Sequence, residues 1–143
     1  MILLDTNVVS EPLRPAGDPA VLAWLDAQAI ETLYLSAISL AELRFGIAAV
    51  PDGKRKETLH ARVEQSIVLL FGARILPFDT AASRAYATLR VRARAAGKAI
   101  GTVDGFIAAI ATAKGFAVAS RDTGPFEAAG LNVINPWAWK ATA

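Results

Sequence analysis

The chain of 143 residues contains no cysteine and a single histidine. The lack of cysteine excludes disulfide bonds, thiolate metal sites and a cysteine nucleophile. His60 lies in the charged segment 54–62, where an exposed helix face is the simplest interpretation. Any catalysis must therefore use carboxylates, hydroxyls, amines or guanidiniums. Any metal site must be built from oxygen ligands, which suit Mg²⁺ or Mn²⁺ rather than zinc.

Long hydrophobic runs are also absent. Although 54% of the residues are hydrophobic and the mean hydropathy is +0.38, no uninterrupted apolar run approaches the roughly 20 residues that cross a bilayer. The apolar N-terminus has no basic lead and reaches an acid at Asp5, so we expect no signal peptide. We expect one cytoplasmic domain over residues 1–143, whose surplus apolar surface meets another protein chain.

Basic residues are concentrated in the middle of the chain. The net charge is only +2, but the segment from Lys54 to Lys98 contains ten basic residues and three acids, a net charge of +7. Such a segment is able to present a cationic surface to a polyanion. Solvated helix faces are an equally good explanation from charge alone.

Short apolar segments alternate with helix-like segments along the chain. We expect strands near residues 2–4, 33–35, 74–76, 116–119 and 131–134. We expect helices over 7–14, from Pro19 with Asp18 as N-cap, over 39–50, 54–71, 80–97 and 103–114, and a short helix or turn over 122–128. This alternation predicts an α/β fold, a three-layer sandwich with a mainly parallel central sheet of about five short strands flanked by helices.

Four acids stand beside apolar segments: Asp5, Glu42, Asp104 and Asp122. Each has a purely structural explanation. Ser39 and Glu42 have the spacing of a helix capping box, and Asp104 falls in the first turn of a helix that Thr102 would cap, where the macrodipole favours an anion. Asp5 and Asp122 would cap the segments that follow their strands. Taken singly, each acid is adequately explained by capping.

Considered together, the four acids point to a cation. In a parallel sheet several of them should lie at the carboxyl ends of the strands, where α/β folds bind ligands. Two carboxylates about 4 Å apart repel by roughly 4 kcal/mol at an effective dielectric near 20, which is more than a cap returns. A converging cluster therefore calls for a divalent ion such as Mg²⁺. Such a centre is suited to hydrolysis of a phosphodiester.

The ordered set of motifs resembles the PIN-domain ribonuclease family, and specifically the VapC-type toxins of bacterial toxin–antitoxin pairs, including their FitB-like branch. The matching pieces are Leu3-Leu4-Asp5-Thr6-Asn7, Ser39-Leu40-Ala41-Glu42-Leu43, Asp104-Gly105-Phe106-Ile107-Ala108-Ala109 and Ala119-Ser120-Arg121-Asp122. The resemblance spans essentially the whole chain. No single piece is specific, but their order and spacing are.

The resemblance implies that Asp5, Glu42, Asp104 and Asp122 are both metal ligands and catalytic residues. It further implies that Thr6 and Ser120 support the site through hydrogen bonds or water, although Thr6 as a plain N-cap is an alternative. The implied activity is that of an endoribonuclease, with Mg²⁺ as the cofactor and Mn²⁺ as a substitute.

The resemblance also implies partners. We expect a homodimer, a small antitoxin that forms a heterotetramer or larger assembly with it, and an RNA substrate. An alternative function is a non-catalytic interaction module that acts through its partner complex. Candidates for contact with the antitoxin are apolar residues near the start of the chain and in the helix that follows Ser39, although an ordinary core role explains them as well: Val8, Leu13, Leu22, Leu25 and 43–49.

Basic residues near the acids are the candidates for RNA binding: Arg90, Arg92, Arg94, Lys98 and Arg121. The first four crowd one helix end just before Asp104, where they would hold phosphates. Cations at a helix C-terminus are also favourable without a ligand. Trp137 and Trp139 are suited either to stacking on bases or to closing the end of the sheet.

Overall fold

The computed structural model describes residues 1–141, so the last two residues of the predicted domain lie outside the described part. Its centre is a five-stranded sheet in the order β3-β2-β1-β4-β5, in which every neighbouring pair is parallel. The strands are β1 (Ile2–Leu4), β2 (Leu33–Ser36), β3 (Ile75–Leu76), β4 (Ala117–Ala119) and β5 (Val133–Ile134). The predicted sheet is confirmed.

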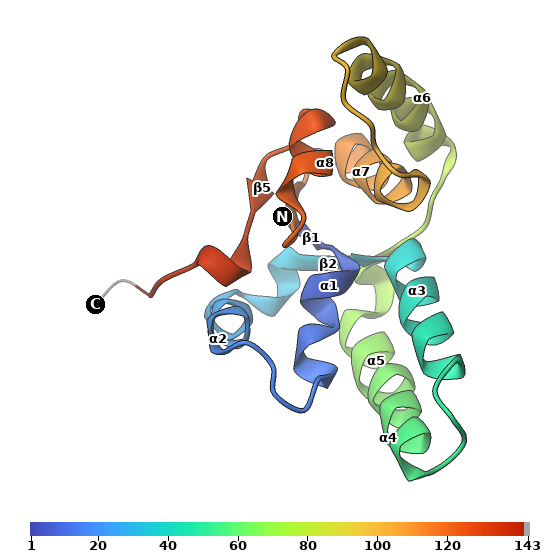
Figure 1. The fold of residues 1–143 in the computed structure, drawn as a ribbon, viewed down its shortest axis with the longest axis vertical. Helices are drawn as coiled ribbons and strands as arrows, with labels where there is room; N and C mark the ends of the chain where they lie inside the picture. The colour runs from blue at the N-terminus through green and yellow to red at the C-terminus, as the bar shows by residue number, and fades with distance from the viewer. Residues whose placement is uncertain (142–143) are drawn as a thin grey trace.

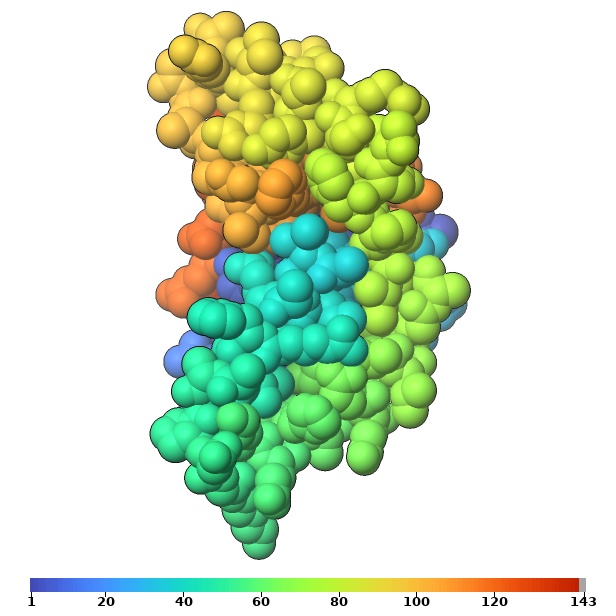
Figure 2. Space-filling model, turned by 90° about the vertical axis from the view of Figure 1, so that its right-hand side faces the viewer, coloured from blue at the N-terminus to red at the C-terminus, as the bar shows by residue number. Residues whose placement is uncertain are grey.

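Helices cover both faces of this sheet, which makes the three layers visible in Figure 1. One face carries α6 (Thr80–Ala95), α7 (Thr102–Lys114) and α8 (Thr123–Ala128). The other carries α1 (Thr6–Val9), α2 (Pro19–Ala27), α3 (Ala37–Ala48), α4 (Lys54–Arg62) and α5 (Val68–Phe71). Figure 2 shows the molecule from the side, with α6 and α7 in the upper half and α3 and α4 in the lower. Residues 1–141 contain no helix with the length and apolar character that a membrane crossing requires.

The central strand β1 is apolar because it is covered on both faces. Leu3 is fully buried in a core with residues of α6, α7 and α8, whereas Leu4 is buried in a second core with residues of α1 to α5. Leu4 is also level with the ends of its neighbours, since it pairs with Leu35 of β2 and Ala119 of β4. The residues that follow these three strands therefore emerge at one edge of the sheet.

Several helix boundaries agree with the sequence-based predictions. Asp18 caps α2 through a 2.8 Å hydrogen bond that its Oδ1 accepts from the Ala20 amide, and Pro19 is the first helical residue. Gly115 ends α7 with a left-handed backbone at φ 72°, which glycine adopts without steric cost.

Two of these predictions were wrong. The helix expected over 7–14 consists of α1 and a separate 3₁₀ turn, Glu11–Leu13, since Pro12 has no amide hydrogen to continue the helix. Gly101, not Thr102, is the N-cap of α7. The helix expected over 54–71 is confirmed in its bounds, and within it the π-helical turn Val63–Ile67 separates α4 from α5. Further 3₁₀ turns are Ile30–Thr32, Gly72–Arg74 and Pro136–Ala138.

Candidate metal centre

The acids gather where the connections of the sheet change direction. From β1 the chain continues to β2 and β3 on one side, and β4 and β5 lie on the other side. The carboxyl ends of β1 and β4, where the strand order changes direction, are the position at which open parallel sheets bind ligands. Asp5 follows β1 directly, and Ser120 follows β4 directly. The strand order thus places these two residues side by side.

Asp5 is a buried carboxylate with both oxygens engaged by donors. Its side chain is 5% exposed. As the N-cap of α1, its Oδ1 accepts a 2.8 Å hydrogen bond from the Thr6 amide, while Oδ2 accepts a 2.7 Å bond from the Ser120 hydroxyl. Asp5, and not Thr6, is therefore the helix cap. Each oxygen retains lone-pair capacity for a further partner.

Burial raises the pKa of Asp5 from 3.8 to about 6. The hydrogen bonds from Ser120 and Thr6 favour the charged form and oppose this shift, whereas the negative charges of Asp104 and Glu42 add to it. A cation beside Asp5 would therefore stabilise its ionised form and lower its pKa.

Glu42 belongs to α3 and approaches Asp5 through Thr6. The Thr6 hydroxyl oxygen lies 2.5 Å from Glu42 Oε1 and 2.9 Å from Ser39 Oγ. Because a hydroxyl carries one proton, the Thr6 hydroxyl donates a hydrogen bond to the Glu42 carboxylate and accepts one from the Ser39 hydroxyl. The result is a chain of hydrogen bonds that holds Glu42 beside the end of β1.

The predicted capping box of Ser39 and Glu42 was wrong. The N-cap of α3 is Ser36, whose hydroxyl accepts a 3.0 Å hydrogen bond from the Ser39 amide. The N-cap therefore lies three residues earlier than expected, because β2 passes into the helix without an intervening loop. Glu42 therefore lies in the second turn, too far along the helix to cap it, and its carboxylate is available to the site.

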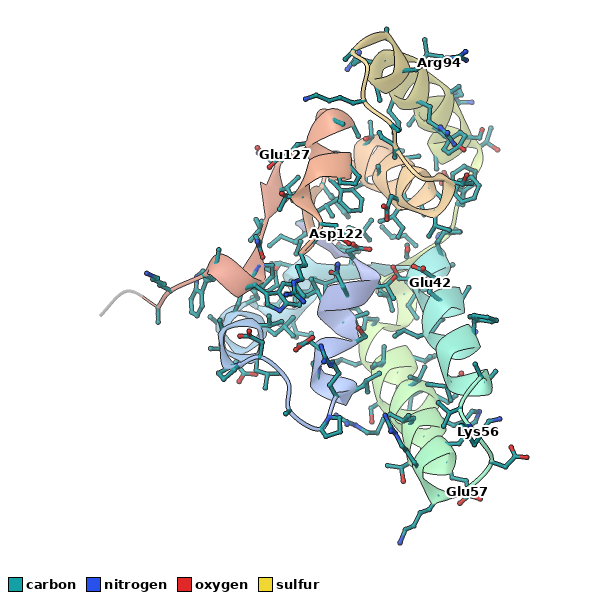
Figure 3. All side chains as sticks on the ribbon, in the orientation of Figure 1. Glu42, Lys56, Glu57, Arg94, Asp122 and Glu127 are labelled. Atoms are coloured by element: carbon teal, nitrogen blue, oxygen red, sulfur yellow. The ribbon has the colours of Figure 1, made fainter. Side chains whose placement is uncertain are left out.

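Asp104 and Asp122 complete the acidic group. Asp104 is half-buried in the first turn of α7; burial raises its pKa, and the charges of Asp122 and Glu42 raise it further. Asp122 is exposed before α8 and makes no side-chain cap bond, while its amide donates a 3.0 Å bond to Ser120 Oγ. In Figure 3 Glu42 and Asp122 lie near the same edge of the sheet, on either side of the ribbon that leads out of β1.

The chemistry of these side chains fits a hard divalent cation. The ion pairs among residues 1–141 involve none of the four acids; they are Arg14–Glu11, Arg44–Glu64 and Lys56–Asp52. The donors are all oxygen, as Mg²⁺ prefers. Within the described part of the chain, however, no three acids stand close enough together to form a ready-made metal site. The charges therefore favour a cation, and the carboxylates are not arranged as a closed coordination sphere.

The predicted RNA-binding residues fall into separate places. Arg90, Arg94 and Lys98 line a shared hollow of about 420 Å³ at the end of α6, whereas Arg92 lines neighbouring hollows instead. Figure 3 places Arg94 at the far end of α6, well away from Glu42 and Asp122. Arg121 alone follows directly in sequence from the residue that bonds to Asp5.

Sequence reasoning missed two supporting residues. Ser39 is fully buried and bonds to Thr6, and the Asn7 side chain accepts a 3.3 Å bond from the Arg121 amide. The adjacency of Asn7 to Asp5 in the N-terminal motif was the available signal. Arg44, two residues from Glu42 in the sequence, forms a double hydrogen bond with Glu64 at 2.7 and 2.9 Å.

A comparison with protein families finds that the PIN-domain model matches residues 2–131. The chain belongs to the PIN-domain family. Among curated PIN-domain relatives, plasmid stability protein StbB of Pseudomonas syringae is 61% identical and VapC ribonuclease Y4jK of Sinorhizobium fredii is 60% identical. Toxin FitB of Neisseria gonorrhoeae is 55% identical. Each alignment covers 96% of this chain and at least 98% of the relative.

The solved structures agree with the sequence relatives. The crystal structure of FitAcB from Neisseria gonorrhoeae superposes with a TM-score of 0.94 at 54% identity and covers 97% of this chain and 100% of that one. These comparisons confirm the predicted family and fold, and they show that the chain is similar to proteins named VapC ribonuclease and toxin FitB.

Proposed function

We propose that this PIN-domain protein is an endoribonuclease that depends on Mg²⁺, for which Mn²⁺ substitutes, and that it is the toxin of a type II toxin–antitoxin pair. The observation that carries the metal dependence is the group of four acids at the switch point of the sheet. No ion pair among residues 1–141 neutralises them, and burial, with a smaller contribution from their mutual charge, raises the pKa of Asp5 and Asp104. The names of the relatives, a ribonuclease and a toxin, support the rest of the proposal.

Each side chain has a distinct part in this proposal. Asp5, Glu42, Asp104 and Asp122 are the ligands and catalytic acids. When bound, the metal would orient and deprotonate a water molecule and stabilise charge on the scissile phosphate. Ser120 fixes the position of one Asp5 oxygen through its 2.7 Å hydrogen bond.

Thr6 and Ser39 hold Glu42 near the end of β1 through the chain of hydroxyls. The basic residues would bind RNA at a distance from this centre. The positive side chains of Arg90, Arg94 and Lys98 line a hollow that would bind RNA phosphates beyond the cleavage point. Arg121 is placed to contact a phosphate next to the acids.

The antitoxin and the homodimer are further parts of the proposal. Of the predicted contact residues, Val8, Leu43 and Ile47 are buried in the core. Leu13 and Leu25, in contrast, line a hollow of about 270 Å³ beneath α2 and α5. Exposed apolar side chains nearby are Ile30, Leu69 and Leu70. Uncovered apolar surface of this kind supports a protein partner.

Metal-dependent cleavage of RNA distinguishes this function from a non-catalytic interaction module. Protein purified free of its partner should cleave RNA with Mg²⁺ or Mn²⁺ and lose that activity in EDTA. Asp5→Asn and Asp104→Asn should abolish cleavage while circular dichroism shows the fold intact. If both variants cleave as fast as the wild type, a contaminating nuclease is responsible and the proposal fails.

A further inference from the structure

Arg121 stands between two residues of the site in the sequence, and within residues 1–141 it forms no ion pair with any of the four acids. It separates Ser120, which bonds to Asp5, from Asp122. Its amide donates a 3.3 Å hydrogen bond to Asn7 Oδ1. A guanidinium beside an acid in the chain is a ready partner for a charge-assisted pair. The ion pairs within residues 1–141 do not include Arg121.

The Arg121 guanidinium lies instead over the indole ring of Trp137. The distance from Arg121 Cζ to the ring centroid is 5.4 Å, within the range of a cation–π contact. The ring is well anchored, because Trp137 packs against the core on the α2 side of the sheet. Its amide also donates a 3.0 Å bond to Asn135 Oδ1. Trp137 is thus an anchored surface against which the Arg121 side chain lies.

Because Arg121 contacts Trp137, both the carboxylates and the guanidinium remain available to bind other groups. Carboxylate oxygens that do not accept from arginine keep their lone pairs for a cation. A guanidinium stacked on an aromatic face keeps its N–H groups, which lie at the edge of its plane, for a phosphate. The hollow of Arg94 and Lys98 lies at the far end of α6, whereas Arg121 is next to Asp122 in the sequence.

We propose that Trp137 is a positioning residue, whose ring holds Arg121 away from the acids so that they remain free for metal and Arg121 remains free for an RNA phosphate. The inference rests on the proposed function, since it assigns a part of the same site. A similar arrangement occurs on α6, where Arg90 Cζ lies 5.4 Å from the Tyr86 ring centroid and its Nη1 lies 2.6 Å from the Tyr86 hydroxyl.

Mn²⁺ binding in the absence of RNA tests the first half of the proposal. Electron paramagnetic resonance of free Mn²⁺ would compare the wild type with Trp137→Leu, Trp137→Phe, Arg121→Ala and the double variant Trp137→Leu/Arg121→Ala. Trp137→Leu should weaken Mn²⁺ binding by about fivefold, because the released guanidinium pairs with the acids. Trp137→Phe keeps an aromatic face and should bind as the wild type does.

The double variant separates positioning from a structural role. Its Mn²⁺ affinity should return to that of Arg121→Ala, because no guanidinium is left to compete. Trp139→Leu is the matched control: Trp139 packs against the same core, and no cation lies over it within residues 1–141. This variant should bind Mn²⁺ normally. Equal Mn²⁺ affinity in Trp137→Leu and the wild type would overturn the proposal, as would a loss that persists in the double variant.

Binding of a fluorescein-labelled single-stranded RNA in EDTA tests the second half. Arg121→Ala should weaken binding and lower the slope of log Kd against log salt by about one, the signature of one phosphate contact. Trp137→Leu should weaken RNA binding in the wild-type background and have no effect in the Arg121→Ala background. Equal weakening in both backgrounds would contradict a role through Arg121.

The Mn²⁺-binding and RNA-binding measurements test the role of Trp137 independently of the proposed endoribonuclease activity. Neither requires RNA cleavage, so an inactive wild type would overturn the endoribonuclease assignment without deciding the role of Trp137. If the wild type binds no Mn²⁺, the metal site fails, and the RNA comparison still decides whether Trp137 acts through Arg121.

Discussion

The hydroxyl of Ser120 donates a 2.7 Å hydrogen bond to Asp5 Oδ2 and so joins the end of β4 to the end of β1 across the switch point of the sheet. The same hydroxyl oxygen accepts a 3.0 Å bond from the Asp122 amide. One fully buried serine therefore positions two of the four proposed ligands.

Replacing this serine should change the titration of Asp5. The hydrogen bond favours the ionised carboxylate, so Ser120→Ala should raise the pKa of Asp5 above its value of about 6. The carboxyl ¹³C shift of Asp5, followed by NMR against pH without metal, measures this directly. Ser10→Ala removes a nearby hydroxyl that bonds to the Asn7 carbonyl and should leave the pKa unchanged. An unaltered pKa in Ser120→Ala would show that the bond does not tune Asp5.

The raised pKa of Asp5 predicts how stability depends on pH without metal. The pKa is about 6 in the folded protein and 3.8 without the fold, so between these values the folded state binds more protons than the unfolded state. The free energy of unfolding therefore falls as pH rises through this window. The resulting penalty is complete above about pH 6 and amounts to at most ~3 kcal/mol. Below pH 3.8 it is absent.

Asp5→Asn should remove this penalty. In EDTA at pH 8 the variant should have a higher Tm than the wild type, and the two should converge as pH falls toward 4, because both side chains are then uncharged. Asp26→Asn, which changes an exposed acid of α2, should show no such pH-dependent difference. A destabilised Asp5→Asn at pH 8 would mean that the cap and its hydrogen bonds outweigh the cost of burying the charge.

The Thr6 hydroxyl should matter for activity more than for folding. Thr6→Val keeps the shape of the side chain but leaves Glu42 without its 2.5 Å donor. A hydrogen bond to a charged group contributes about 1.5–3 kcal/mol, so kcat/KM for RNA cleavage should fall roughly tenfold to a hundredfold if that bond acts fully in the transition state. Thr6→Ser restores the hydroxyl and should recover most of the rate. Equal rates for the valine and serine variants would exclude this role.

The hollow at the end of α6 should contribute to RNA affinity without contributing to chemistry. Arg94→Ala/Lys98→Ala should reduce the slope of log Kd against log salt by about two, since each side chain would release one phosphate contact. The single-turnover rate at saturating RNA should not change. Lys54→Ala/Arg55→Ala removes the same charge from exposed positions on α4 and is the control. An equal loss in both pairs would indicate only a general effect of net charge.

The sequence predicted the sheet well because its strands are nearly all apolar. Because β1 is buried on both faces, its residues do not alternate between apolar and polar. The apolar run Ile2–Leu4 and its end at Asp5 were therefore sufficient to predict the strand. Helix starts were predicted less well. Ser36 and Ser39 both precede apolar helical residues, and only the absence of a loop after β2 decides that Ser36 is the cap.

The sequence predicted which residues form the candidate site, but it did not predict the hydrogen bonds and contacts between them. Acids placed after parallel strands must share an edge, so Asp5 and Asp122 followed from the alternation of elements. The bond between Thr6 and Glu42 joins residues 36 positions apart and depends on how α3 packs. The contact of Arg121 with Trp137 likewise depends on where the chain runs after β5. Neither has a local signal in the sequence.

Binding of Mn²⁺ to the RNA-free protein is the most direct test of the account. Asp104→Asn is the decisive variant, because Asp104 is half-buried and its pKa is raised by Asp122 and Glu42 as well as by burial. The wild type and the control Asp26→Asn should bind Mn²⁺ and cleave RNA over the same range of Mn²⁺ concentration. Asp104→Asn should lose both properties while its Tm in EDTA is no lower than that of the wild type. Mn²⁺ affinity equal to that of the wild type, or RNA cleavage that persists in Asp104→Asn, would contradict a metal centre built on these acids.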